Sequence, residues 1–466
     1  MNKPLHARPL LARPVAGGHV QSDQWIRDDR WSRFTAALVW LLIVYLVIPN
    51  SYWTGDVLST NATVTAMAQV NVVARAIKVG LIALSSLVLL WRSSLAMQLV
   101  RTLNPFFLVF LALVPLSIFW SIDRSATSAR YVSVLSIVLT CFAFALVGWH
   151  QRRFQSVVRP VVTLLLAASL VFGILHPELA IEAGEQGSLK NSWHGLASQK
   201  NQFGELASFG VLFWLHASLF KQVRWQITLP CSGIAWTCVL LSRSSTSLLA
   251  SVLSTGFMLL MVSVPANLRR YMPYMVGGFA IIVMLYALAV LNLIPGSSFI
   301  LEPITLLTGK DMTFTGRSVI WDIIREHIQL APWLGSGYGA YWTGLSLDSP
   351  SYIVFMTRIY FYPSEAHNGY LEIVNDLGFA GLACLLGYLI VWVRQSLRLL
   401  RFDRAQAALF LAIFFQQAIT NLSESTWFAI NSAFAIAVVT LATIALARAL
   451  LEQRLTQRFG NEGAGT

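Results

Sequence analysis

Long apolar runs, interrupted by short basic links, constrain this chain more than any other feature of its sequence. Hydrophobic residues make up 56% of the 466 residues and charged residues only 12%, which is outside the range of soluble globular domains. Each run has about the length that crosses a bilayer as a helix, roughly 17–25 residues. The sequence therefore predicts an all-α polytopic membrane protein with about twelve transmembrane helices, at residues 34–49, 72–91, 105–120, 131–149, 157–176, 203–220, 226–241, 248–264, 274–294, 370–393, 405–421 and 427–447.

Lysine and arginine gather in alternate links between these runs, as they do on the cytoplasmic side of membrane proteins. Because the net charge of +12 is spread over links rather than gathered on one face, nucleic acid is not an expected partner. The alternation predicts a cytoplasmic tail, nine transmembrane helices, one large periplasmic loop with short amphipathic helices, three more transmembrane helices and a second cytoplasmic tail, at residues 1–33, 34–294, 295–369, 370–447 and 448–466.

The polar stretch at residues 292–369 interrupts the apolar chain and concentrates Arg317, His327, Glu365 and His367. Hydrophobicity alone gives no reason for such a cluster in a chain of this composition. We therefore interpret this loop as the reaction site.

A helical pattern opens at Gly316, Arg317 and Ser318, runs to about Leu330 and is stopped by Pro332. Trp321, Ile324 and Ile328 lie on the same face as Arg317. It predicts an amphipathic helix at the membrane surface with Arg317 at its start. Because an arginine fork and helix N-terminal N–H groups both bind phosphate oxygens, Arg317 is a candidate catalytic residue that holds a diphosphate. The alternative is an arginine that contacts lipid headgroups.

His367 and Asn368 directly precede the apolar run at residues 370–393, so Asn368 is the expected N-cap of that helix. Histidine is suited to proton transfer near neutral pH, which makes His367 a candidate catalytic residue. Glu365 is close enough in sequence to orient it and is a candidate substrate-binding residue. The alternative is a capping histidine without a chemical role.

Four further cations are candidate substrate-binding residues. Lys200, just before the run at residues 203–220, and Arg243, in the short turn before the next predicted helix, are candidate further contacts to a phosphate. Arg75 and Lys78 lie near the outer end of the second run, where they either line the same cavity or extend to the membrane surface.

The sequence GSGYG at residues 335–339 lacks the Gly-Lys-Ser/Thr of a phosphate-binding loop, and no dinucleotide-fold strand precedes it. It predicts a tight turn that brings Tyr338, Tyr341 and Trp342 toward the site. Sugars stack on aromatic faces, so Tyr338 and Trp342 are candidate substrate-binding residues. The alternative is that these aromatic residues mark the membrane interface.

Motifs for metal and hydrolase chemistry are absent from the sequence: it has no Asp-x-Asp, no His-Glu-x-x-His and no Gly-x-Ser-x-Gly. Glu178, Glu182 and Glu185 are interpreted as a solvated acidic turn, because no further ligand follows at metal-binding spacing. We therefore predict a cationic site that uses neither a metal nor another cofactor.

Three blocks, TGRSVIW, PWLGSGYGAYW and EAHNGYLEIVNDLGFAGL, closely resemble the core of the O-antigen ligase and polymerase superfamily (Wzy-type) of bacterial envelope glycosyltransferases. GLASQKNQFGE, SRSSTSLLA and NLSES resemble smaller blocks of the same superfamily, in the form found in exopolysaccharide polymerases. The resemblance follows the family order over residues 193–424.

The resemblance implies a multi-helix transferase of the bacterial inner membrane with a periplasmic active site, which moves a glycan from undecaprenyl diphosphate to an acceptor hydroxyl without a metal or nucleotide. By similarity, Arg317 and Lys200 match positions that bind the diphosphate, and His367 matches the histidine that activates the acceptor. Gln199 departs from the family pattern, which has a histidine before Lys-Asn, so no role is assigned to it.

Three functions follow as hypotheses. The first is polymerisation of undecaprenyl-diphosphate-linked oligosaccharide repeat units into exopolysaccharide or O-antigen, with a chain-length-determining protein as a partner. The second is ligation of finished glycan to lipid A core or to a protein. The third is a lipid-linked oligosaccharide flippase, although a transporter should hold its polar residues near the membrane midplane. We expect inversion at the anomeric carbon, which a covalent role for Glu365 would overturn.

Overall fold

The computed structural model describes residues 29–49, 72–182, 191–290, 317–342, 350–352, 363–428 and 433–462. Within these residues the regular secondary structure is α-helical apart from one antiparallel strand pair, β1 (Ile181–Glu182) with β2 (Ser192–Trp193), and two 3-10 helices, η3 (Ser117–Phe119) and η5 (Ala266–Tyr271). The α-helices are α1 (Asp29–Val47), α4 (Val72–Trp91), α5 (Ser93–Val100), α6 (Pro105–Leu116), α7 (Arg124–Leu146), α8 (Arg153–Leu175), α9 (Pro177–Ala180), α10 (Lys200–Leu219), α11 (Trp225–Leu241), α12 (Ser245–Ser263), α13 (Met272–Val290), α15 (Arg317–Leu330), α17 (Gly369–Leu399), α18 (Arg404–Thr420) and α19 (Ala433–Glu462).

Every one of the twelve predicted apolar runs overlaps one of these helices, which confirms an all-α membrane protein. Seven helices of the described chain are long and apolar enough to cross a membrane: α1, α4, α7, α8, α12, α17 and α19. The bent pair formed by α5 and the segment from α6 through η3, with an angle of 106° between its two parts, makes an eighth if it counts as one span. The count of about twelve spans stays a prediction, because α11 and α13 have only short apolar stretches and α10 and α18 contain several polar side chains.

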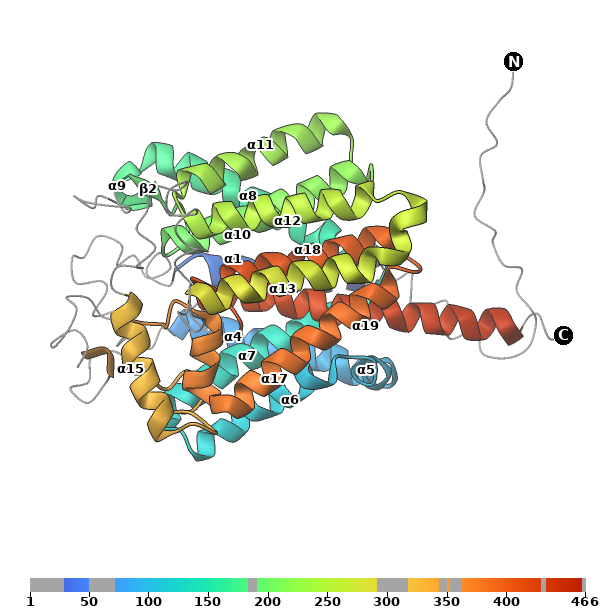
Figure 1. Ribbon diagram of the computed structural model, residues 1–466. Helices are drawn as coiled ribbons and strands as arrows, with labels where there is room; N and C mark the ends of the chain where they lie inside the picture. The colour runs from blue at the N-terminus through green and yellow to red at the C-terminus, as the bar shows by residue number, and fades with distance from the viewer. Residues whose placement is uncertain are drawn as a thin grey trace, which may run out of the picture.

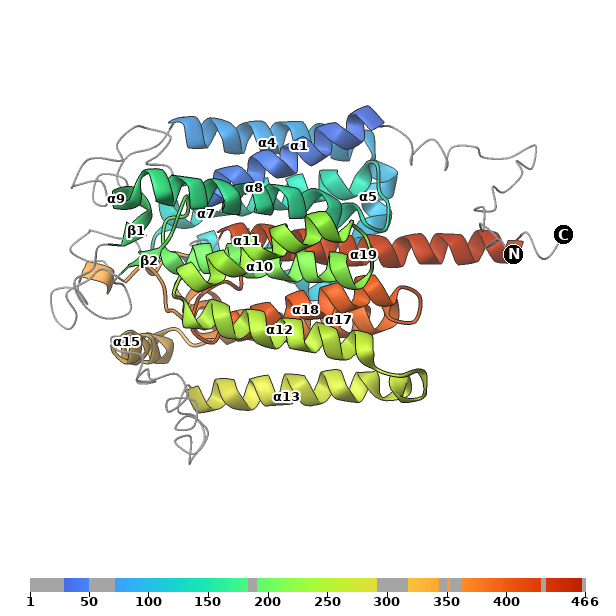
Figure 2. The ribbon, with the colours of Figure 1, turned by 90° about the horizontal axis from the view of Figure 1, so that it is seen from above.

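The long helices run in one general direction, and the segments that carry the predicted site gather at one end of the bundle (Figures 1 and 2). At that end α15 lies across the direction of the other helices, and α9 lies beside the strand pair. The basic links lie at the opposite end, where η5 joins α12 to α13 and where α17 turns into α18. In the interior, α18 packs against α12 and α17, and α19 packs against α7.

A break in α17 fixes the connection between α15 and the bundle. Gly378 has non-helical backbone angles, φ 63° and ψ −165°, so the helix changes direction there. The freed N–H groups of Phe379 and Ala380 donate to the carbonyl oxygens of Pro332 and Trp333, at 2.8 and 3.2 Å. A break inside an apolar helix is tolerated when other backbone groups satisfy its hydrogen bonds, and here the segment that follows α15 supplies them.

The predicted tight turn at residues 335–339 docks on the same break. The Ser336 N–H donates to the carbonyl oxygen of Asn375 at 3.0 Å, and the Gly337 N–H donates to that of Asp376 at 2.9 Å. The three glycines of the turn have positive φ, a conformation that glycine adopts without steric cost. The tight turn itself is confirmed, whereas contact of its aromatic residues with a substrate stays a prediction. The structural effect of the turn is to tie the end of α15 to the first half of α17.

We predict that Gly378→Ala destabilises the protein by about 2 kcal/mol or more, because a Cβ at this position would lie 2.2 Å from the Trp333 carbonyl carbon and φ is positive. Thermal unfolding of the detergent-solubilised protein measures the effect. Gly233→Ala in α11 is the matched control, since a Cβ there meets nothing within 4 Å. Equal unfolding temperatures for the two variants would contradict this account of the break.

Candidate active site

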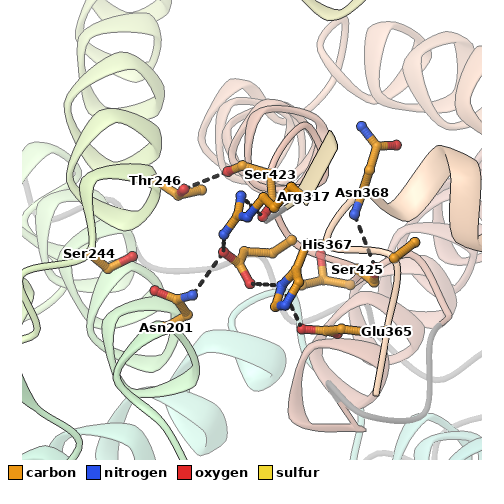
Figure 3. A network of polar contacts seen from close by, with 12 residues as sticks. Asn201, Ser244, Thr246, Arg317, Glu365, His367, Asn368, Ser423 and Ser425 are labelled. Carbon is orange, nitrogen blue, oxygen red and sulfur yellow. Dashed lines mark hydrogen bonds and ion pairs between the residues drawn. The ribbon is translucent and has the colours of Figure 1, made fainter. Parts of the chain in front are cut away.

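Glu424, in the link between α18 and α19, is the centre of a polar network at the end of the bundle that holds α15 (Figure 3). It is 6% exposed. Its Oε1 accepts a hydrogen bond from Arg317 Nη2 of α15 at 2.9 Å and one from Asn201 Nδ2 of α10 at 2.8 Å. Arg317 Nη1 also donates to the carbonyl oxygen of Ser423 at 2.5 Å. The guanidinium is therefore held by two groups of one link.

His367 lies on the other side of the same carboxylate. Its Nδ1 is 3.5 Å from Glu424 Oε2 and 3.2 Å from Glu365 Oε1, so the ring stands between two carboxylates (Figure 3). Glu365 is 2% exposed. His367 has φ 49°, a left-handed conformation that is uncommon for a residue with a Cβ. Strained backbone of this kind persists only where the surrounding structure enforces it.

Contacts of the next residue, Asn368, hold His367 in this conformation. Asn368 is the N-cap of α17, as predicted. The Asn368 side-chain oxygen accepts from the N–H groups of Tyr370 and Leu371, both at 3.1 Å, at the start of α17. Its Nδ2 donates to the carbonyl oxygen of Leu422, and its backbone N–H donates to Ser425 Oγ, both at 3.2 Å. The segment that carries His367 is thus joined to the link that carries Glu424.

Asn421 completes this joint from the other side. Its Oδ1 accepts from the N–H groups of Thr426 and Trp427, which folds the link into a compact turn, and its carbonyl oxygen accepts from the Gly369 N–H. A Cβ at Gly369 would lie 1.8 Å from Asn421 Oδ1, so only glycine fits this approach. Two segments more than fifty residues apart in sequence therefore hold His367 and Glu424 in fixed relative positions.

Opposite charges set the protonation of the site. Burial by itself lowers the pKa of His367, but Glu365 and Glu424 outweigh burial and raise that pKa to about 10. Burial likewise acts to raise the pKa of Glu424, but Arg317 and His367 outweigh it and hold that pKa below its usual value. At neutral pH the resting site therefore pairs Arg317 and the His367 imidazolium with the Glu424 carboxylate.

The charges of this site suit the binding of an anionic ligand at Arg317. Arg317 has a planar fork of donors that matches phosphate oxygens as well as it matches a carboxylate. If a diphosphate oxygen took the place of Glu424 on Arg317, the Glu424 carboxylate would still have its contacts with Asn201 and His367. Glu365 Oε2 is buried and has no hydrogen-bond partner among the described residues, so it is available to accept a proton.

A metal ion is a second possibility for the same residues. One ligand atom from each of Glu365, His367 and Glu424 lies within 4.8 Å of the others, which is a suitable spacing for a cation. However, Arg317 and Asn201 already occupy Glu424 Oε1. Because a guanidinium this close opposes a second cation, the geometry favours the arginine as the positive group of the site.

Lys200 and Arg243 lie at the same end of the bundle as this network. Lys200 is the first residue of α10 and directly precedes Asn201, which contacts Glu424. Arg243 is exposed in the turn between α11 and α12, with φ 50°. That turn is joined to the Glu424 link, because Thr246 Oγ1 and Ser423 Oγ are 2.5 Å apart (Figure 3).

The other predicted site residues have different surroundings. Arg75 is exposed on α4, and Lys78, one turn further along, lines a separate cavity. The Tyr338 side chain is buried against Phe110, and its hydroxyl donates to the carbonyl oxygen of Phe428. Trp342 packs in the small hydrophobic cluster beneath α15. In the described residues the two aromatic side chains thus support the scaffold that positions α15.

Sequence reasoning missed Glu424 and Asn201 as members of the site. A usable signal existed for Glu424, because it is the only charged residue between Arg404 and Arg448. A lone carboxylate between two apolar runs is expensive unless a cation pairs with it. Asn201 carried no such signal, since amides are ordinary residues at helix starts.

These features define a class: a multi-pass helical membrane protein with a buried cluster of arginine, histidine and glutamate at one end of its bundle. Residues 231–386, which include Arg317, Glu365 and His367, match the family described as O-Antigen ligase. The exopolysaccharide production protein ExoQ of Rhizobium meliloti (strain 1021) is 29% identical over 339 residues, which cover 68% of this chain and 72% of that protein. Both matches support the O-antigen ligase/polymerase superfamily, which the sequence blocks of this chain resemble.

We predict that the stability supplied by His367 falls as pH rises. The folded-state pKa of about 10 lies above the unfolded value of about 6.5, so the contribution is complete below about pH 6.5 and is lost as pH rises through about 10. The unfolding temperature of the wild type should exceed that of His367→Gln by several degrees near pH 6, and the difference should disappear near pH 10. His176→Gln, at an exposed histidine, is the control. A difference that does not change with pH would contradict the ion-paired imidazolium.

Proposed function

We propose that the protein is a glycosyltransferase that polymerises undecaprenyl-diphosphate-linked oligosaccharide repeat units into exopolysaccharide or O-antigen. The observation that carries the proposal is the position of Arg317, which pairs with the Glu424 carboxylate beside His367. The superfamily and the name of the relative ExoQ support transfer of glycan in exopolysaccharide production. A chain-length-determining protein is a further proposed partner.

The proposed donor places its diphosphate on Arg317. Breaking the bond between the anomeric carbon and the diphosphate leaves additional negative charge on a group that is already an anion. A fixed cation in a site that excludes water stabilises that charge, and the reaction then needs no metal ion. Lys200 and Arg243, at the same end of the bundle, are the proposed additional contacts to the phosphates.

The acceptor hydroxyl must lose a proton while it attacks the anomeric carbon. We expected His367 to take this proton. Because its pKa is raised to about 10, the ring is already protonated at neutral pH. The proposed base is therefore the His367 and Glu365 pair, in which the unpartnered Glu365 Oε2 receives the proton and the imidazolium stabilises the pair.

In this scheme one glycosidic bond forms to the acceptor oxygen, the bond to the diphosphate breaks, and the proton moves to the Glu365 side of the pair. A single displacement of this kind inverts the anomeric carbon. We place the site on the periplasmic side of the bacterial inner membrane with both termini in the cytoplasm. The basic links at the opposite end of the bundle support this orientation.

We predict that Arg317→Ala and His367→Ala each lower transfer from a purified lipid-linked repeat unit at least about 100-fold, because each removes a charge from the site. Proteoliposomes that contain the variants allow new glycosidic bonds to be counted by mass spectrometry. Arg325→Ala is the matched control, since Arg325 lies on the same helix and pairs with Asp322 at the surface. Near-normal activity of both site variants would refute the assignment, and so would translocation of the lipid-linked unit without any new bond, which would indicate a flippase.

A ligase that transfers finished glycan to lipid A core or to a protein is the second candidate, because the matching family is described as O-Antigen ligase. The two activities leave different intermediates on the lipid carrier. For a polymerase we expect that deletion of the gene leaves single repeat units on undecaprenyl diphosphate. Long carrier-linked chains in the deletion strain would instead identify a ligase, and gel or mass analysis of the carrier-linked glycans separates the two.

A further inference from the structure

A second polar cavity lies beside the Glu424 network, and no step of the proposed reaction uses it. It has a volume of about 230 Å³ and is bounded by the end of α1, by α4, α7 and the start of α10, and by the start of α19. Figure 2 shows α1 and α4 above α7 and α10 at this part of the bundle. Its polar lining residues are Lys78, Ser133, Ser136, Ser198, Gln202 and Glu205.

The first turns of α10 separate this cavity from the Glu424 network and belong to both. Asn201 donates to Glu424 Oε1, while the next residue, Gln202, lines the cavity. Glu205, one turn further along α10, also lines it and accepts a hydrogen bond from Gln417 Nε2 at 2.9 Å. Glu205 is close enough to Glu365 and Glu424 for their charges to interact. A ligand in the cavity would therefore lie next to the reaction site.

The polar lining offers both donors and acceptors. Lys78 is half-buried and has no ion-pair partner among the described residues, so its ammonium group is available to a ligand oxygen. Gln202 supplies an amide, whose Oε1 also accepts from Ser198 Oγ, and Glu205 supplies a carboxyl group. Ser133 and Ser136 supply hydroxyl oxygens as acceptors, because both hydroxyls donate to carbonyl oxygens of α7. Sugar hydroxyls donate and accept hydrogen bonds at once, so they match such a mixed set.

Two aromatic side chains, Tyr45 of α1 and Phe434 of α19, complete the lining. A pyranose ring has apolar C–H faces that pack on aromatic rings, in addition to its hydroxyls. A diphosphate would find only one cation here, Lys78, together with the carboxyl group of Glu205. The lining therefore fits a sugar better than it fits a phosphate.

We propose that this cavity is a carbohydrate subsite that binds one sugar ring of the glycan substrate. Its volume is below the ~300–1,000 Å³ of pockets that enclose drug-sized ligands, which suits one ring rather than a whole repeat unit. The inference deepens the proposed function and rests on it, because it takes the glycan as substrate. The ring belongs either to the donor or to the acceptor, and the two sources are separated by kinetics.

The test measures binding without turnover. The probe is the repeat-unit oligosaccharide freed from its lipid by mild acid, titrated by calorimetry into purified protein in nanodiscs. Gln202→Ala and Lys78→Met should each weaken binding about tenfold or more, because each removes a hydrogen bond to the sugar, and for Lys78 a charged one. Gln226→Ala, the same change at an exposed position of α11, is the matched control and should bind like the wild type. Inorganic pyrophosphate is titrated in parallel and should bind all four proteins equally.

Two results would overturn the subsite: no loss of oligosaccharide affinity in Gln202→Ala and Lys78→Met, or a loss of pyrophosphate affinity in both, which would indicate an anion site. Transfer assays with Gln202→Ala then identify the source of the ring. The apparent KM rises for the acceptor oligosaccharide if the ring belongs to the acceptor, and for the lipid-linked donor if it belongs to the donor. Failure of the proposed function is distinguishable from failure of the subsite. A wild type that binds the oligosaccharide through this cavity but forms no glycosidic bond would refute the transferase activity and leave the subsite supported.

Discussion

A buried carboxylate needs positive partners, and at Glu424 this requirement organises the end of the molecule that carries the site. Arg317 comes from α15, His367 from the segment before α17, and Asn201 from α10, and all three meet at one side chain of the α18–α19 link. Removing one partner of a buried pair leaves an uncompensated charge, which is costly. The arrangement is therefore stable only when four separate parts of the chain are in place together.

Backbone contacts also hold those parts in position. The break at Gly378 lets the segment after α15 dock on α17, and this contact holds α15 across the end of the bundle. The interlocked turns around Asn368 and Asn421 then fix the distance between His367 and Glu424. Arg243 and His367 both have left-handed backbone, which persists only where the surrounding structure enforces it.

Much of this could be predicted from sequence, for identifiable reasons. Apolar runs place helices reliably because a bilayer requires satisfied backbone groups, and each predicted run coincides with a helix. The α15 helix was predicted from periodicity and ends at Leu330, before Pro332, as expected. Arg317 and His367 stood out because charge is rare in this chain. The roles of the aromatic residues in the glycine-rich turn were harder to predict, since a tyrosine or tryptophan near a membrane surface has several equally good explanations. Tyr338 and Trp342 pack into the scaffold.

By itself the sequence determined the class of protein, the positions of the helices and the separation of basic links from polar loops. It also identified Arg317 and His367 as candidate site residues. Those properties depend on local composition, because the composition of a segment decides whether it is more stable in the bilayer or in water. Only the tertiary structure decided that Glu424 joins Arg317 to His367, that the imidazolium is paired on both sides, and that Lys78 lines a cavity that Arg317 does not line. These depend on contacts between residues that are tens to hundreds of positions apart, and a protonation state depends on every charge that surrounds it in space.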